Sequence, residues 1–63
     1  GRYGLMNKSQ KQTLAFANKY KWWHSFAADK ATVDVVFQLT NKGLLQVNEY
    51  RQFRITPKGG LEQ

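Results

Sequence analysis

The sequence predicts an α+β domain with three helices and a C-terminal two-stranded β-hairpin. Two observations favour this class. A helical pattern of apolar residues over 33–42 stops at Gly43, and glycine commonly ends helices because it adopts the left-handed conformation. Two alternating stretches follow directly, at residues 44–48 and 52–56, and such alternation is typical of strands with one buried face.

The chain is expected to form one domain over residues 1–63, with flexible ends at 1–8 and 60–63. A domain of this size buries only about 60% of the surface that its unfolded chain exposes, so its core must be small. Four Phe, three Tyr and two Trp supply the large rings that such a core needs. Cysteine is absent and His24 is the single histidine, so no disulfide or structural zinc site is expected.

A first helix is expected from residue 10 to about residue 21. Ser9 and Gln12 have the spacing of a capping box, in which each side chain pairs with the backbone N–H of the other residue. The apolar residues of this helix fall on one side at 100° per residue. We expect solvated side chains for Lys8, Lys11, Lys19 and Lys21.

Residues 22–26, Trp-Trp-His-Ser-Phe, are expected to be a short extended segment that leads into a turn, because they lack helical spacing. One indole can lie in the core and the other half exposed against the hairpin, since such large rings are seldom buried completely. Ser25 is well placed to cap a brief second helix that runs to Lys30.

The longer helix, residues 31–42, is expected to be covered on two sides and to keep one ridge in solvent. Its apolar arc of about 200° comprises Val33, Val35, Val36, Phe37 and Leu39. Its polar stripe comprises Lys30, Ala31, Asp34, Gln38, Asn41 and Lys42. Asp29 or Thr32 can cap its start.

The alternation also predicts the register of the hairpin. With a three-residue loop at 49–51, Val47 lies opposite Phe53 and Leu45 lies opposite Ile55, so the apolar pairs share one face. A two-residue loop would mix polar and apolar residues on each face. The longer loop is therefore expected, although its left-handed position usually holds Gly or Asn. Residues 56–60 are expected to break the strand, and 61–63 to fray.

Over residues 9–59, the order of helix, short strand, brief helix, longer helix and hairpin resembles the winged helix-turn-helix fold. The most specific match is to small bacterial and phage transcriptional regulators, and it comprises Val36, Leu39, the stretch Lys42-Gly43-Leu44-Leu45 and the stretch Arg54-Ile55-Thr56-Pro57-Lys58-Gly59. The resemblance implies a duplex DNA-binding domain with the longer helix in the major groove and the hairpin wing along the backbone or minor groove. The segment before the longer helix is shorter here than in that family.

The charge of the chain is consistent with a DNA partner. Ten Lys and Arg against four Asp and Glu give a formal charge of +6, which is typical of phosphate-binding proteins but also serves solubility alone. On the longer helix, the amides of Gln38 and Asn41 can pair with adenine, and Lys30 and Lys42 suit guanine or phosphate. Two further candidates on this helix are Asp34, which can accept from cytosine or repel phosphate, and Thr32, at the helix start.

In the hairpin, Arg51 at the tip and Arg54 on the outward face can reach phosphates, because guanidinium groups match phosphate oxygens. Lys58 can add a third contact. Each charge can instead be simply solvated, or form a weak surface ion pair such as Arg51 with Glu49.

An enzyme is not expected, and neither is a cofactor or a metal. His24 lacks an evident nucleophile or acid partner. Two-metal nuclease chemistry is not favoured, because different predicted elements carry the acids Asp29, Asp34, Glu49 and Glu62.

One domain of this size contacts few base pairs, so tight specific binding calls for a homodimer or a partner protein. Two alternatives stay open: a protein–protein interaction module on the same scaffold and an RNA-binding domain. No apolar run reaches the roughly 20 residues of a membrane span, and residues 1–5 lack a signal-peptide pattern. We therefore expect a cytoplasmic protein, nucleoid-associated if bacterial, with Met6 as a candidate natural start.

Overall fold

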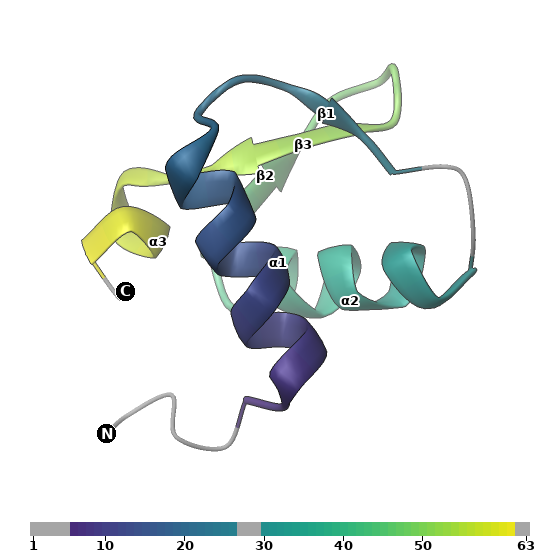
Figure 1. Ribbon diagram of the computed structural model, residues 1–63. Helices are drawn as coiled ribbons and strands as arrows, with labels where there is room; N and C mark the ends of the chain where they lie inside the picture. Colours follow the sequence, from purple (N-terminus) through teal and green to yellow (C-terminus); the bar gives the residue numbers. More distant parts are fainter. Residues whose placement is uncertain (1–5, 27–29, 62–63) are drawn as a thin grey trace.

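The computed structural model describes residues 6–26 and 30–61 (Figure 1). These residues form an α+β domain with three helices and three strands. In chain order the elements are α1 (Lys8–Lys19), β1 (His24–Ser25), α2 (Lys30–Asn41), β2 (Leu45–Val47), β3 (Gln52–Ile55) and α3 (Pro57–Leu61). None of the helices in this part of the chain has the length and apolar character needed to cross a bilayer.

The three strands form one antiparallel sheet in the order β1-β3-β2. In the hairpin, Leu45 pairs with Ile55 and Val47 pairs with Phe53, so the predicted register is confirmed. Strand β1 adds a pairing that the sequence did not predict, with His24 opposite Phe53.

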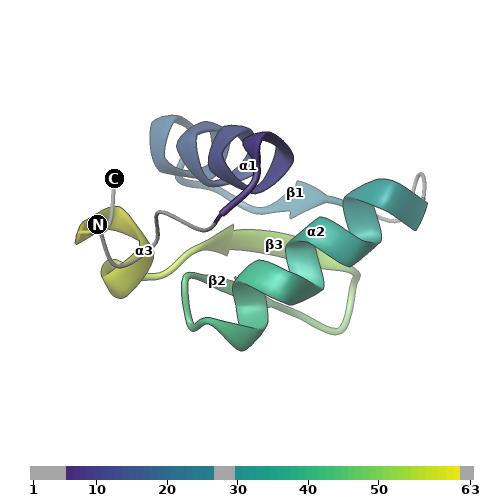
Figure 2. The ribbon, with the colours of Figure 1, turned by 90° about the horizontal axis from the view of Figure 1, so that it is seen from below.

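Helices α1 and α2 lie on the same side of the sheet, and Figure 2, which views the domain from that side, shows α2 crossing in front of β2 and β3. Burial alternates along the strands accordingly: Phe53 and Ile55 are buried, whereas Gln52 and Arg54 are only half-buried. The core between the layers consists of Leu14, Ala17, Phe26, Val36, Leu39, Leu44, Leu45, Phe53 and Ile55. The opposite face of the sheet is not covered by any described helix.

Helix α1 begins two residues earlier than the sequence suggested. Its N-cap is Asn7, whose side-chain oxygen accepts from the N–H of Gln10 at 2.9 Å, while the N–H of Asn7 donates to the side chain of Gln10 at 3.0 Å. The predicted box of Ser9 and Gln12 is therefore wrong. Asparagine caps as well as serine, and this start places Gln10, Leu14 and Ala17 in one buried stripe.

Helix α2 ends as predicted, at a left-handed glycine. Gly43 has φ +77°; its N–H donates to the carbonyl of Thr40, and the N–H of Leu44 donates to the carbonyl of Leu39. This is the Schellman pattern. At the other end, Thr32 lies inside the helix and does not cap it, and the alternative cap, Asp29, falls outside the described residues.

The loop of the hairpin has the predicted three residues, but an arginine takes the left-handed position. Arg51 has φ +59°. The side-chain oxygen of Asn48 holds the loop by accepting from the N–H groups of Tyr50 at 2.9 Å and Gln52 at 3.1 Å. These hydrogen bonds hold the loop in shape, although its left-handed position lacks the glycine that would adopt this conformation more easily.

Helix α3 follows the hairpin and was not predicted from the sequence. Residues 56–60 were expected only to break the strand, yet α3 begins at Pro57, a favoured first helical residue. The hydroxyl of Thr56 accepts from the N–H of Gly59 at 3.0 Å and donates to the carbonyl of Gly43 at 2.7 Å. A brief helix was expected over residues 25–30. Ser25 lies in β1 and does not cap a helix, and residues 27–29 lie outside the described part of the chain.

Parts of the two expected flexible ends belong to the folded elements. Met6 packs against the core and Asn7 caps α1. At the other end, Gly60 and Leu61 complete α3.

Candidate nucleic-acid interface

The nine residues predicted to bind DNA do not form one continuous surface. Six belong to α2 and the residue after it, one to the tip of the hairpin, one to the uncovered face of the sheet, and one to α3. In that order they are Lys30, Thr32, Asp34, Gln38, Asn41 and Lys42, then Arg51, Arg54 and Lys58.

The polar stripe of α2 is exposed over most of its length. Asp34, Gln38, Asn41 and Lys42 are all exposed, and we refer to these four residues as the α2 ridge. Thr32 is half-buried and lines two grooves that also involve α1, so it faces away from the ridge. The side chain of Lys30 is outside the described part of the structure.

An aromatic ring lies beside this ridge, where the sequence predicted a covered side chain. Phe37 is 46% exposed, and its ring meets that of Phe26 edge-on, with centroids 5.7 Å apart. The sequence predicted that the other elements cover the side chain of Phe37. This prediction is wrong, because about half of that side chain is exposed. The ridge thus combines polar groups with one apolar contact.

Gln38 is partly committed to the fold. Its side-chain oxygen accepts a hydrogen bond of 2.7 Å from the amide of Gln10, which is buried in α1. Because a bidentate pair with adenine uses both the oxygen and the amide of a carboxamide, the bond to Gln10 restricts the orientations in which Gln38 can make one. Asn41 is exposed and forms no such described bond, which makes it the better placed of the two amides.

Two lysines gather at the C-terminal end of α2. Lys42 directly follows the helix, and the side chain of Lys58 passes over Gly43, with its ammonium 3.7 Å from the place where a β-carbon on Gly43 would stand. The carbonyl end of a helix carries partial negative charge, which favours nearby cations. The position of Lys58 is therefore explained by the fold itself.

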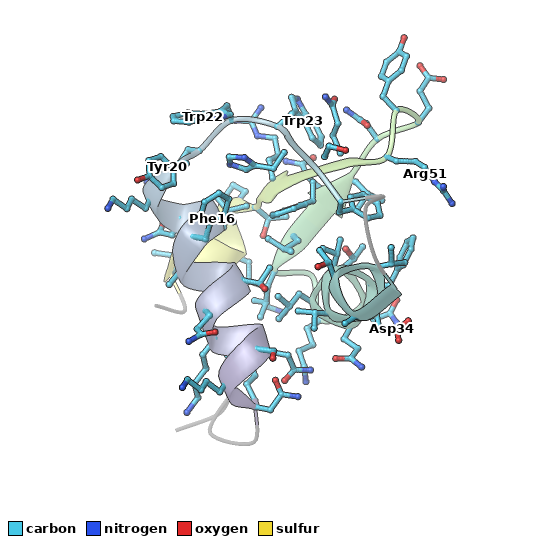
Figure 3. The ribbon with its side chains drawn as sticks, turned by 45° about the vertical axis from the view of Figure 1, so that its right-hand side comes forward. Phe16, Tyr20, Trp22, Trp23, Asp34 and Arg51 are labelled. Carbon is cyan, nitrogen blue, oxygen red and sulfur yellow. The ribbon has the colours of Figure 1, made fainter. Side chains whose placement is uncertain are left out.

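Arg51 lies at the opposite end of α2. Its carbonyl accepts from the N–H of Phe26 at 3.2 Å, and the hairpin tip lies at the end of the molecule where α2 begins (Figures 1 and 2). Figure 3 shows the side chains of Arg51 and Asp34 projecting from the same edge of the domain. Cationic side chains thus stand at both ends of the ridge.

Arg54 is separated from these residues by the sheet. Its guanidinium lies over the ring of Trp23, 5.5 Å from the centroid, within the range of a cation–π contact. Its buried Nε–H has no hydrogen-bond partner among the described residues. Arg54 therefore belongs with the tryptophans on the uncovered face, not with the α2 ridge.

Sequence reasoning missed how exposed the aromatic segment is. Neither indole lies in the core: Trp22 is 60% exposed, and Trp23 is half-buried against the hairpin. The ring of Trp22 contacts Tyr20 and His24, with centroids 5.2 and 5.5 Å apart. No local pattern of the sequence predicts this exposure, because Trp22 lies at a bend of the backbone, where the alternation of an extended strand does not apply.

His24 packs among aromatic rings, including that of Trp22, and forms a hydrogen bond with the backbone. Its Nε2 is 2.7 Å from the carbonyl oxygen of Tyr20, and its ring contacts Phe16 and Phe53. Within residues 6–26 and 30–61, no three His, Asp or Glu side chains gather where they could hold a metal ion.

The chain has no match among protein-family models, curated proteins or solved structures.

Proposed function

We propose that this chain binds double-stranded DNA as a small winged helix-turn-helix module, as part of a bacterial or phage transcriptional regulator. The α2 ridge would enter the major groove, and the β2–β3 hairpin would follow the backbone. The observation that carries this proposal is the exposed polar ridge of α2, with cationic side chains at both of its ends.

The dimensions of α2 suit this arrangement. Its 12 residues make a helix of about 18 Å at 1.5 Å per residue, and the major groove is about 12 Å wide. A helix lying in the groove therefore brings its two ends close to the phosphates that border it. Lys42 and Lys58 would meet phosphates at one end and Arg51 at the other, while the polar side chains between them face the bases.

The fold adds support through the order of its elements. The described order α1, β1, α2, β2, β3 follows that of the winged helix apart from the brief helix before α2. The pairing of β1 with β3 holds the hairpin to the helical layer. This support is limited to architecture, because one fold can carry several functions.

Base reading would fall mainly to Asn41. Its exposed amide can donate to and accept from adenine, whereas the oxygen of Gln38 is held by Gln10. The carboxylate of Asp34 would accept a hydrogen bond from a cytosine amino group. It would repel the phosphates where α2 is wrongly positioned along the DNA. Phe37, beside the ridge, is suited to contact a thymine methyl group.

The proposal is tested by titrating labelled random duplex DNA at several salt concentrations. Contacts from Lys42, Arg51 and Lys58 predict that log affinity falls against log salt with a slope of about −3. Replacing Arg51 by Ala should weaken all duplexes alike and reduce the slope by about 1. Lys8→Ala, which removes the same charge from an exposed site on α1, is the matched control and should have a smaller effect.

Specific recognition needs a selected binding site and a second pair of variants. Asn41→Ala should reduce discrimination between the selected and random duplexes by about 1–3 kcal/mol, and Gln38→Ala should reduce it less. Absence of duplex binding at low salt would reject the proposal and favour a protein partner for the ridge.

A further inference from the structure

The uncovered face of the sheet carries a row of side chains that the α2 ridge does not use. Gln46 and Arg54 are paired across β2 and β3. Trp23 directly precedes β1, and its ring continues the row under the guanidinium of Arg54. Figure 3 shows Trp23 on the side of the sheet away from α2.

A groove borders this row at the end where α1 and α3 approach the sheet. It has a volume of about 650 Å³ and is lined in part by Asn18, Lys21, Gln46, Arg54 and Thr56. Both charged residues of the described lining are cations. The groove therefore has the charge that complements a phosphate, and its volume lies within the range of about 300–1,000 Å³ that is usual for ligand sites.

Trp22 adds a ring that is available for stacking. It is 60% exposed, and contacts with Tyr20 and His24 support it. A ring that is already held in place loses little conformational freedom when a ligand stacks on it. Lys21, the preceding residue, is also exposed and lines the groove.

We propose that this surface binds single-stranded nucleic acid. We call it the tryptophan face, and it comprises Lys21, Trp22, Trp23, Gln46 and Arg54. Single strands present unstacked bases together with phosphates, and proteins bind them by combining aromatic rings with cationic grooves. A base stacks on the exposed ring of Trp22, while Lys21 and Arg54 meet the neighbouring phosphates.

This surface is independent of the one proposed for duplex DNA. The bases of a duplex are stacked on each other and offer Trp22 no free ring face, whereas α2 reads the edges of paired bases. Trp22 and Arg51 lie on different parts of the molecule (Figure 3). The two activities can therefore be lost separately.

The test is a titration of labelled 12-mers of deoxythymidine and of uridine, followed by anisotropy and by tryptophan fluorescence. We expect binding at low salt with quenching of the indole emission. Trp22→Ala should weaken binding by about 5- to 150-fold, the loss of one base–aromatic stack. Lys21→Ala should reduce the magnitude of the salt slope by about 0.7, as one phosphate contact to a single strand predicts.

The matched control is Tyr50→Ala. Tyr50 is the other strongly exposed aromatic residue of the described chain, 74% exposed at the hairpin tip, and its removal should leave single-strand affinity within about twofold of the wild type. If Trp22→Ala loses its fold by circular dichroism, Trp22→Leu tests the loss of the ring with an apolar side chain kept, and should weaken binding by at least fivefold.

The proposal is overturned if neither oligomer binds at low salt, or if removing the ring of Trp22 changes affinity no more than Tyr50→Ala does. Arg51→Ala distinguishes the two proposals: it should weaken duplex binding but leave the oligomers bound as before. Retained oligomer binding in a chain that fails to bind duplex would support the tryptophan face alone.

Discussion

Gly59 is the residue at which α3 meets the rest of the fold. It is buried, and a β-carbon placed on it would collide with the carbonyl oxygen of Leu44 and stand 2.8 Å from Cγ1 of Ile55. The carbonyl of Leu44 also accepts from the N–H of Thr56 at 3.1 Å, so it has little freedom to yield. Only glycine fits here, for reasons of space.

We predict that Gly59→Ala lowers the free energy of unfolding by about 1–3 kcal/mol, the usual cost of forcing extra atoms into a packed site. Gly60→Ala is the control, because a β-carbon there would meet only the side-chain oxygen of Asn18, at 3.6 Å. It should be neutral or slightly stabilising, since alanine favours helix. Urea denaturation measures both, and equal losses would contradict the close-packing argument.

Arg51 occupies a backbone conformation that disfavours its side chain. A non-glycine residue held at positive φ costs on the order of 1–3 kcal/mol, and such strain is often found at functional sites. We predict that Arg51→Gly raises the free energy of unfolding by about 1 kcal/mol while it weakens duplex binding. Arg51→Ala should weaken binding without the gain in stability. A glycine variant no more stable than the alanine variant would show that the loop is not strained.

At the scale of the elements, the start of α1 gives a direct test of the observed cap. Asn7→Ala should lower the free energy of unfolding by about 1 kcal/mol, the typical value for a lost N-cap. Ser9→Ala should change it by less than about 0.5 kcal/mol, because Ser9 is exposed inside the first turn. Thermal unfolding of the two variants would distinguish the caps. A larger loss of stability for Ser9→Ala than for Asn7→Ala would contradict the observed cap and favour the one predicted from the sequence.

The elements differ in how far the sequence could predict them. The hairpin register followed from alternation, because a shift of one residue would turn Phe53 and Ile55 to the wrong face. Helix α3 did not, because Gly59 and Gly60 weaken any helical pattern. The helix forms since Thr56 caps it and Gly59 can approach Leu44 closely, and both contacts depend on the tertiary fold.

At the scale of the whole molecule, the two proposed surfaces should report binding differently. Trp22 lies across the domain from Asp34 and Arg51, and Trp23 lies on the side of the sheet away from α2 (Figure 3). We predict that single-stranded oligomers quench the tryptophan emission, whereas duplex DNA at the α2 ridge leaves it nearly unchanged. A fluorescence titration with each ligand checks this, and strong quenching by duplex would mean that the duplex contacts the tryptophan face.

The spacing of residues along a helix predicts which side chains are exposed, but not which other elements they contact. It correctly predicted that Asp34, Asn41 and Lys42 are exposed, because their spacing fixes their side of α2. It could not show that the amide of Gln10 reaches Gln38, since the two residues lie on different helices. Arg54 was correctly assigned to the outward face, but its pairing with Trp23 depends on the path of β1, which no local pattern of the sequence specifies.

The pairing of β1 with β3 also has a consequence for the order of folding. Helix α2 and the hairpin are contiguous in the chain, so their contacts close short loops, whereas His24 reaches Phe53 only across nearly half the chain. Contacts between distant residues incur a larger loop entropy before they contribute any energy. We therefore expect the transition state to contain α2 and the hairpin with β1 still unpaired, so substitutions at His24 would accelerate unfolding and leave the refolding rate almost unaltered.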